Sequence, residues 1–460
     1  MLRLTEYSHT DVEARGTLLG AAQVAAEIAG AQRDALGCAA SAVEVLHRIL
    51  ETCGITQTEF QNALLAARLH GSSVDEELMA GTVVSARELA SATAEALGLV
   101  QEDIDPNATL LRDGRGALAA SERHAKTCDG ALRARLYLAP KLERLDTLIA
   151  GLRRTPGLAR SLRITTLADI AALREAADKT ERSNRARLSL AADHNRWSAR
   201  DVLTPLQAAL LVVLLMLLAH GWYASPQWFW FALHATASSA ALGLTLFRLR
   251  VLVGTVRERS RAPSRPPPPA APDTAAPLYS VLVALHREAD MAAPLAKAMA
   301  ELDWPRSRLE VFFVCEANDP ATIAAVERAI EHQPNFSVIA TPRTYPTTKP
   351  KALNFALPLA RGEYLVLFDA EDRPHPQQLR AAHEAFRTHP PELACVQAPL
   401  VIRNAGNGWL ETLFALEYAV LFRAVLPWLA KRSLPVTRKN GWHGAGLGGI
   451  DREMVVEALI

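Results

Sequence analysis

The sequence predicts an α/β domain built on a parallel sheet, preceded by a small, mainly α module and a two-helix transmembrane hairpin. Three observations support this fold class: strands and helices alternate from residue 278, two long apolar runs fill residues 202–254, and residues 42–105 repeat a helical pattern. A βαβα order is typical of a parallel sheet with right-handed crossovers. With 460 residues, the chain is also long enough for several domains.

Composition excludes several classes of protein. The formal net charge of +1 lacks the basic excess of a nucleic-acid binder, so no nucleic-acid partner is expected. The five cysteines show no CxxC spacing, which argues against a zinc site or a disulfide framework. The first residues lack the apolar core of a secretory signal. Residues 1–41 are therefore expected to form an N-terminal helical extension.

Residues 42–105 contain two similar helical hairpins. Thr56 to Glu59 and Ser85 to Glu88 each have the spacing of a capping box before an apolar helix. This module resembles the amino-terminal domain of type II secretion ATPases, which in some relatives binds cyclic di-GMP through Arg-Leu-Gly stretches. The corresponding segments here, 46–54 and 73–81, lack Arg-Leu-Gly. The resemblance thus leaves two partners open, cyclic di-GMP and another protein, and the residues favour a protein-contact or degenerate regulatory role.

Residues 106–200, rich in alanine and arginine, are expected to form a helical connector. The hairpin follows at 202–254, where each of two apolar runs is long enough to cross a hydrocarbon core of about 30 Å. Trp222, Trp228 and Trp230 cluster where an interfacial belt belongs.

Arginines flank both ends of the hairpin, and the loop between its helices is uncharged. The positive-inside rule then places both flanks in the cytoplasm. We expect a multi-pass protein of the bacterial inner membrane, in contact with lipid, with cytoplasmic N- and C-terminal domains. A proline-rich linker at 257–277 connects the membrane to the downstream domain.

Polar side chains follow three apolar strands of the carboxy-terminal domain. The strands are 279–285, 309–315 and 364–368, and the last is followed by Asp-Ala-Glu-Asp. The carboxyl ends of parallel strands meet at one edge, where open α/β sheets bind ligands. Clustered carboxylates suit Mg²⁺ or Mn²⁺. The alternative for Asp-Ala-Glu-Asp alone is a turn that ends the strand and caps the helix near Pro376.

Five segments in order resemble the processive, membrane-bound branch of glycosyltransferase family 2, which includes cellulose synthase and other bacterial β-glucan synthases. They are SVLVALHREAD (280–290), VFFVCEANDPATIAAV (311–326), TTKPKALNFAL (347–357), YLVLFDAEDRPHPQQL (364–379) and CVQAPLVIRNAGNGWLETLFALEYAVLF (395–422). The resemblance implies a GT-A-type (Rossmann-like) catalytic domain at 278–435. It further implies an inverting hexosyltransferase that passes a sugar, glucose, from a UDP-sugar donor to a growing polysaccharide acceptor.

The resemblance also implies roles for individual residues. The metal ligands for Mg²⁺ or Mn²⁺ are Asp369, Glu371 and Asp372. Gln397 lies on the acceptor side. The donor-binding residues are His286, where the family usually has tyrosine, Glu288, Asp319, Lys349 and Asp369. No catalytic residue is identified, because the general base is expected beyond the matched region.

The resemblance stops after Pro435. Residues 436–460 form an atypical tail without the Thr-Glu-Asp and Gln-x-x-Arg-Trp motifs of the family. This pattern is typical of a truncated or frameshifted C-terminus, so the enzyme is expected to be incomplete as written. The alternative is a non-catalytic membrane regulator or pseudoenzyme that binds nucleotide or a second messenger.

Overall fold

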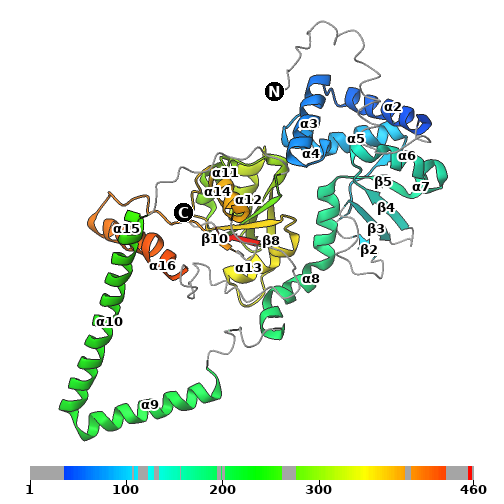
Figure 1. The fold of residues 1–460 in the computed structure, drawn as a ribbon. Coiled ribbons are helices and arrows are strands. Elements are labelled where there is room, and N and C mark those ends of the chain that lie inside the picture. The colour runs from blue at the N-terminus through cyan, green and yellow to red at the C-terminus, as the bar shows by residue number, and fades with distance from the viewer. Residues whose placement is uncertain are drawn as a thin grey trace.

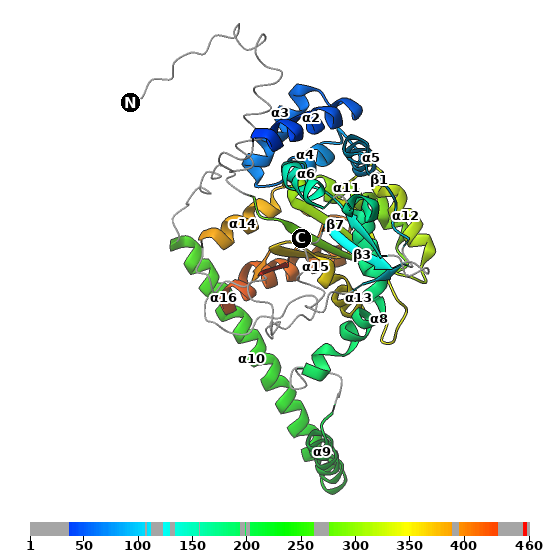
Figure 2. The ribbon, with the colours of Figure 1, turned by 90° about the vertical axis from the view of Figure 1, so that its right-hand side faces the viewer.

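The computed structural model describes most of the chain and is shown in two views in Figures 1 and 2. The described residues are 36–105, 108–111, 123–128, 134–155, 157–193, 198, 203–261, 276–388, 395–430 and 454–457. The predicted extension at 1–41 lies outside them up to residue 35, and its end belongs to the first described helix.

Four helices form the predicted N-terminal module: α2 (Leu36–Thr52), α3 (Gln57–His70), α4 (Val74–Ala80) and α5 (Ala86–Leu97). Both predicted capping boxes are present, with Thr56 accepting from the Glu59 backbone and Ser85 from the Glu88 backbone. Ile49 and Leu78, equivalent positions of the two hairpins, are fully buried in one core. The helical prediction for this module is confirmed.

Among the described residues of the predicted helical connector, 106–200, helices predominate from residue 142, but strands occupy the earlier part. A five-stranded sheet in the order β1-β5-β4-β3-β2 begins before this segment and fills part of it. Its strands are β1 (Val100–Gln101), β2 (Thr109–Leu110), β3 (His124–Cys128), β4 (Ala134–Leu138) and β5 (Leu162–Ile164). These strands are two to five residues long, too short for a clear period of two. Pairing between neighbours overrides the helix propensity of alanine and arginine here.

Helices complete the connector. They are α6 (Leu145–Arg154), α7 (Leu158–Ser161) and the long α8 (Leu167–Asp193), with a 3₁₀ turn η1 at Leu142–Arg144. The first half of α8 buries Ile170 and Leu173 against Tyr137 of the small sheet. In Figure 1, α8 then continues past α13 of the carboxy-terminal domain. A single helix therefore contacts both halves of the molecule.

Two apolar helices stand where the hairpin is predicted, α9 (Pro205–Ala224) and α10 (Pro226–Arg261). Thr204 caps α9, and Pro205 occupies its first turn. Figure 1 shows this pair extending away from the rest of the molecule. Their apolar side chains are largely exposed, which would be costly in water. By length and composition, both helices could cross a membrane.

A third segment, Trp409–Leu429, is also long and apolar enough to cross a membrane. It consists of α15 (Trp409–Val420), a π-helical turn η6 (Leu421–Val425) and α16 (Leu426–Ala430). Trp428 contacts α10 through an edge-to-face pair with Phe247, 5.7 Å between ring centroids, and lies beside the buried Val251. This third segment was not predicted as a span from the sequence.

The carboxy-terminal sheet has six parallel strands in the order β10-β11-β9-β6-β7-β8. The strands are β6 (Tyr279–Leu285), β7 (Leu309–Glu316), β8 (Phe336–Thr341), β9 (Tyr364–Phe368), β10 (Cys395–Gln397) and β11 (Met454–Glu457). The predicted parallel α/β sheet is confirmed. Four residues of the predicted atypical tail, β11, pair between β9 and β10.

Helices cover both faces of this sheet. Along β6, Val281 and Val283 face one core while Leu282 faces the other, as the period of a strand requires. The first core includes residues of α11 (Ala292–Ala300), α12 (Pro320–Ile330) and α14 (Gln378–Thr388); the second includes residues of α13 (Lys349–Ala356) and α8. Short 3₁₀ turns, η3 (Ala289–Met291), η4 (Arg306–Arg308) and η5 (Leu357–Leu359), lie in the connections.

Gly362, two residues before β9, has no room for a side chain, and we predict that Gly362→Ala destabilises the protein. An added Cβ would lie 2.5 Å from the backbone nitrogen of Ser280 and 2.6 Å from its Oγ. The Ser280 hydroxyl accepts the Gly362 N–H at 2.7 Å, so the clash also breaks a hydrogen bond. We expect a loss of about 1–3 kcal/mol, measured as a fall in melting temperature.

The control is Gly151→Ala in α6, where nothing lies within 4 Å of the added Cβ. It should be neutral or stabilising, and equal effects of the two variants would contradict the prediction.

Candidate active site

The loops that follow β6 and β7 are hydrogen-bonded to each other. The N–H of Arg287, a residue with φ of 56°, donates to Asp319 Oδ2 at 2.7 Å. The N–H of Glu288 donates to Thr322 Oγ1 at 3.2 Å, and that of His286 donates to Glu288 Oε2 at 3.3 Å. Three of the predicted site residues, His286, Glu288 and Asp319, are therefore brought together at the carboxyl edge.

Asp319 is also the N-cap of α12, since its Oδ1 accepts the N–H of Thr322 at 3.3 Å. Partial burial would raise the pKa of this carboxyl. Hydrogen bonds from the Thr322 hydroxyl and from the N–H groups of Arg287 and Thr322, with the nearby His286, outweigh that effect and lower the pKa. Asp319 thus carries its negative charge at any pH near neutrality.

A second pairing joins α13 to the end of β9. The Lys349 ammonium, at the first position of α13, forms an ion pair with Asp369 Oδ1 directly after β9. The side chain of Lys349 is 31% exposed and that of Asp369 is 12% exposed. A lysine ammonium beside a carboxylate on a partly open edge provides charges of both signs for a ligand that carries phosphate and metal.

Asp372, the third predicted metal ligand, is buried. It is 3% exposed, and its Oδ2 accepts the backbone N–H of Asp369 at 2.7 Å. Glu371, in contrast, is exposed. Among the described residues, no three His, Cys, Asp or Glu side chains are placed to hold one metal ion. The structure places Asp369, Glu371 and Asp372 on one turn after β9 but turns Asp372 inward, and the three-residue ligand set stays a prediction.

The oxygens that could hold Mg²⁺ or Mn²⁺ are thus those of Asp369 and Glu371. Both are hard carboxylate ligands of the kind these ions bind. They lie on the turn directly after β9, and the Lys349 ion pair already occupies one oxygen of Asp369. The donor chemistry fits a divalent cation held jointly with a diphosphate, since such ions often combine few protein carboxylates with substrate phosphates.

A buried ion pair beneath this edge was not predicted from the sequence. Lys351 Nζ lies 3.1 Å from Glu316 Oε1, and it also donates to the carbonyl of Pro342 at 3.0 Å. The two side chains are 4% and 8% exposed. The pair connects α13 to the end of β7, just as Lys349 connects α13 to the end of β9. Two lysines in Lys-Pro-Lys therefore fix the start of α13 to two strand ends.

Gln397, predicted on the acceptor side, is the last residue of β10. It aligns with Glu457 of β11, and β11 separates it from β9. Gln397 therefore shares the carboxyl edge with the other predicted residues but lies two strands away from Asp369.

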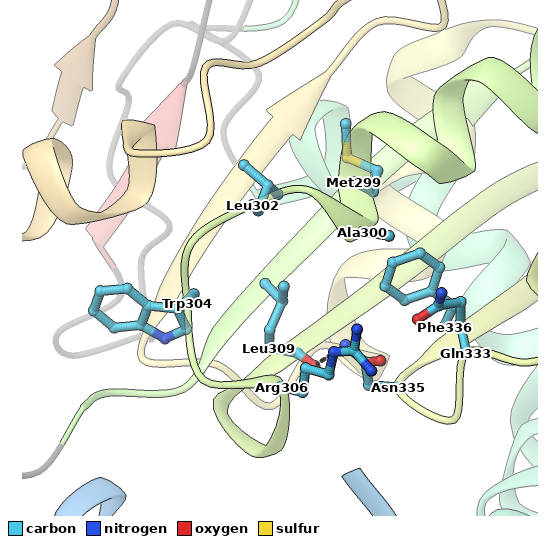
Figure 3. A pocket seen from close by; sticks show the side chains of 9 residues that line it. All are labelled: Met299, Ala300, Leu302, Trp304, Arg306, Leu309, Gln333, Asn335 and Phe336. Atoms are coloured by element: carbon cyan, nitrogen blue, oxygen red, sulfur yellow. Dashed lines mark hydrogen bonds between the residues drawn. The ribbon is translucent and has the colours of Figure 1, made fainter. Parts of the chain in front are cut away.

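A small cavity lies at the opposite end of the sheet (Figure 3). Its lining includes Leu309, the first residue of β7, and Phe336, the first residue of β8. Its volume of about 50 Å³ is far below the roughly 300 Å³ of an ordinary ligand pocket. None of the predicted site residues lines it. This cavity is a packing gap, and the candidate site is the carboxyl edge where the predicted residues lie.

Asp319 supports a prediction about both stability and pH. Asp319→Ala removes the cap of α12 and the acceptor for Arg287, so we expect a loss of about 1 kcal/mol, whereas Asp319→Asn keeps a capping oxygen and should lose less. Because the folded pKa is lowered, ionised Asp319 stabilises the fold at pH values above its ordinary pKa. That contribution disappears as the pH falls through the lowered pKa. Melting curves from pH 7 down to pH 3 should show the wild type and Asp319→Asn converging only at the acidic end. A difference independent of pH would contradict this account.

Comparison with known proteins finds similarities for the carboxy-terminal part of the chain. Residues 280–443 match the family model described as glycosyl transferase family 2. The β-monoglucosyldiacylglycerol synthase of Nostoc sp. is 27% identical over 136 residues, which are 29% of this chain and 29% of that protein. The β-monoglucosyldiacylglycerol synthase of Trichormus variabilis is 26% identical over 136 residues, with the same coverage. The chain therefore spans less than a third of the length of the curated relatives it matches.

Two solved structures are similar in part. The mannosyltransferase PcManGT from Pyrobaculum calidifontis, in complex with GDP-Man and Mn²⁺, has 28% identity and a TM-score of 0.28; the match covers 35% of this chain and 47% of that one. S. aureus TarS 1–349 with UDP-GlcNAc has 24% identity and a TM-score of 0.24, over 28% of this chain and 36% of that one. The family match confirms the predicted resemblance to glycosyltransferase family 2 at the level of the family. The cellulose synthase branch and the resemblance of the N-terminal module stay predictions.

Proposed function

We propose that this chain is an inverting hexosyltransferase of the bacterial inner membrane, which transfers glucose from UDP-glucose to a growing polysaccharide on the cytoplasmic side. The observation that carries the proposal is the pairing of Lys349 with Asp369 at the carboxyl edge of a parallel sheet. This edge lies within the region that matches glycosyl transferase family 2. A sugar nucleotide needs positive charge for its diphosphate and carboxylates for the accompanying cation, and this pair supplies both.

Each predicted residue has a task in this proposal. Glu288 and Asp319 contact the nucleoside; the Glu288 carboxylate accepts the N–H of His286, and the Asp319 carboxylate accepts the N–H of Arg287. His286 is the first residue of the loop after β6. Lys349 releases Asp369 and approaches the diphosphate, and Gln397 contacts the acceptor from β10.

Asp369 and Glu371 hold Mg²⁺ or Mn²⁺ in the proposal. When bound, the cation neutralises the charge that develops on the leaving UDP. Asp372 is left out of the ligand set because its carboxylate holds the backbone of Asp369. Its task is to fix the turn on which the two ligands are carried.

The membrane part of the proposal rests on α9 and α10, whose most apolar 18-residue segments have mean hydropathies of 1.8 and 1.4 and are almost entirely unburied within the chain. We propose that they form the transmembrane hairpin. The segment Trp409–Leu429 then adds a third apolar helix next to α10. Because it follows β10, this helix could bring an acceptor on or in the membrane close to the carboxyl edge.

The experiment that tests the function is a donor and acceptor screen on the full chain in lipid nanodiscs. Release of the nucleoside diphosphate, UDP from UDP-glucose and UDP-GlcNAc and GDP from GDP-mannose, is measured with Mn²⁺, with Mg²⁺ or with EDTA. We expect release from UDP-glucose that depends on the cation, and a β-linked product by NMR. Diacylglycerol is included as an acceptor because the curated relatives are named for it. A glucolipid product would replace the polysaccharide in the proposal.

The competing function, a nucleotide-binding membrane regulator, is decided by the same samples. Binding of UDP with no turnover of any donor would favour the regulator. If the protein shows no UDP binding and no turnover of any donor, both functions are refuted.

A further inference from the structure

The second half of α8 belongs to the covering layer of the carboxy-terminal sheet. Ala186 is buried in the same core as Leu353, Phe355 and Ala356 of α13 and strand residues of β6 and β9. The Arg182 guanidinium lies over the ring of Phe355, 5.0 Å from its centroid. The amide of Asn354 donates to the carbonyl of Ala186 at 3.4 Å. Residues far upstream of the sheet thus complete the face on which α13 packs.

The same helix holds the loop that leads into α13. The hydroxyls of Ser183 and Thr344 are hydrogen-bonded at 3.1 Å, and Ser183 is only 6% exposed. Arg187 donates to the carbonyl of Tyr345 at 3.4 Å. Thr344 and Tyr345 precede Lys349 by only a few residues, and Lys349 is the first residue of α13. Both the loop before Lys349 and the helix after it therefore contact α8.

We propose that Ser183 is a positioning residue for Lys349, acting through Thr344. This inference rests on the proposed function, because it assigns Ser183 an effect on the binding of the donor diphosphate. The buried ion pair between Lys351 and Glu316 fixes the start of α13 to the end of β7. The loop before it has half-buried and exposed residues, so its contacts with α8 define the path by which the backbone reaches Lys349. A loop that is free to move would leave the ammonium in several places and weaken its contact with the diphosphate.

The test compares binding of UDP, which carries the diphosphate, with binding of uridine, which lacks it. Dissociation constants for UDP with Mn²⁺ and for uridine are measured on the full chain in nanodiscs, for the wild type, Ser183→Ala and Lys349→Ala. We expect Ser183→Ala to weaken UDP binding by about three- to tenfold, the effect of one neutral hydrogen bond, and to leave uridine binding unchanged. In the Lys349→Ala background, Ser183→Ala should have no further effect on UDP. Equal losses for UDP and uridine, or a full additional loss in the double variant, would overturn the proposal.

A second measurement does not need a ligand. Hydrogen exchange of peptides covering 342–349 should become about tenfold faster in Ser183→Ala and in Thr344→Val, while peptides of β6 and β7 keep their wild-type rates. Ser189→Ala, on the same helix, is the matched control and should change nothing. If wild type binds no UDP, the proposed function fails, and exchange alone then decides the inference. Faster exchange supports the hold of α8 on this loop, and unchanged exchange overturns it.

Discussion

Asp369→Asn is expected to lower glucose transfer by about 10²-fold or more. The substitution keeps the size of the side chain but removes the charge that pairs with Lys349 and that would hold the cation. Stabilisation of the leaving group by a cation is worth several kcal/mol, and each 1.4 kcal/mol is a factor of about ten in rate. The measurement is UDP release from UDP-glucose with saturating Mn²⁺, together with the affinity for UDP.

The matched control for this prediction is Glu363→Gln. Glu363 is an exposed carboxylate directly before β9, at the opposite end of the strand from Asp369. It should retain wild-type transfer. Melting curves of both variants show whether Asp369→Asn still folds. Wild-type transfer and UDP affinity in a folded Asp369→Asn protein would remove Asp369 from the proposed site.

Lys351→Met is expected to give the largest loss of stability. Lys351 and Glu316 are both almost fully buried, so removing the ammonium leaves an uncompensated carboxylate inside the protein. Breaking such a pair typically costs about 3–5 kcal/mol. For the carboxy-terminal domain this corresponds to a fall in melting temperature on the order of 10 °C. The measurement is thermal unfolding of the full chain in nanodiscs.

Two further variants show whether the unpaired charge causes that loss of stability. Lys297→Met removes a lysine from an exposed pair with Glu301, whose charged atoms lie 4.0 Å apart, and should cost well under about 1 kcal/mol. The double variant Glu316→Leu/Lys351→Met removes both charges, so it should recover most of the stability lost by Lys351→Met. A double variant as unstable as the single one would show that packing, and not the unpaired charge, accounts for the effect.

Much of the carboxy-terminal architecture could be predicted because buried parallel strands are continuous apolar runs. Tyr364–Phe368 is such a run, and the topology requires the residue after it, Asp369, to share an edge with the ends of β6 and β7. The joined loops of Glu288 and Asp319 follow from the same topology. Sequence spacing was sufficient here because strand direction, and not side-chain detail, places these residues.

Other features depend on side-chain directions that spacing does not encode. Asp372 and Glu371 are neighbours in one turn, yet one accepts a backbone N–H and the other is exposed. Lys351 looks like an ordinary surface lysine in the sequence, but a turn of α13 faces it towards Glu316. The strands of the N-terminal sheet are too short to show a pattern. The packing of α8 into the second core was likewise not predicted from the sequence of residues 106–200.

The central claim is that the carboxyl edge of the sheet binds the diphosphate of a sugar nucleotide with a divalent cation. The most direct test is an experimental structure of the full chain with UDP and Mn²⁺, in which anomalous scattering locates the manganese. We expect manganese at Asp369 and Glu371, the diphosphate beside Lys349, and the uracil near Glu288 and Asp319. Nucleotide bound elsewhere, or manganese away from Asp369 while this edge stays folded, would contradict it.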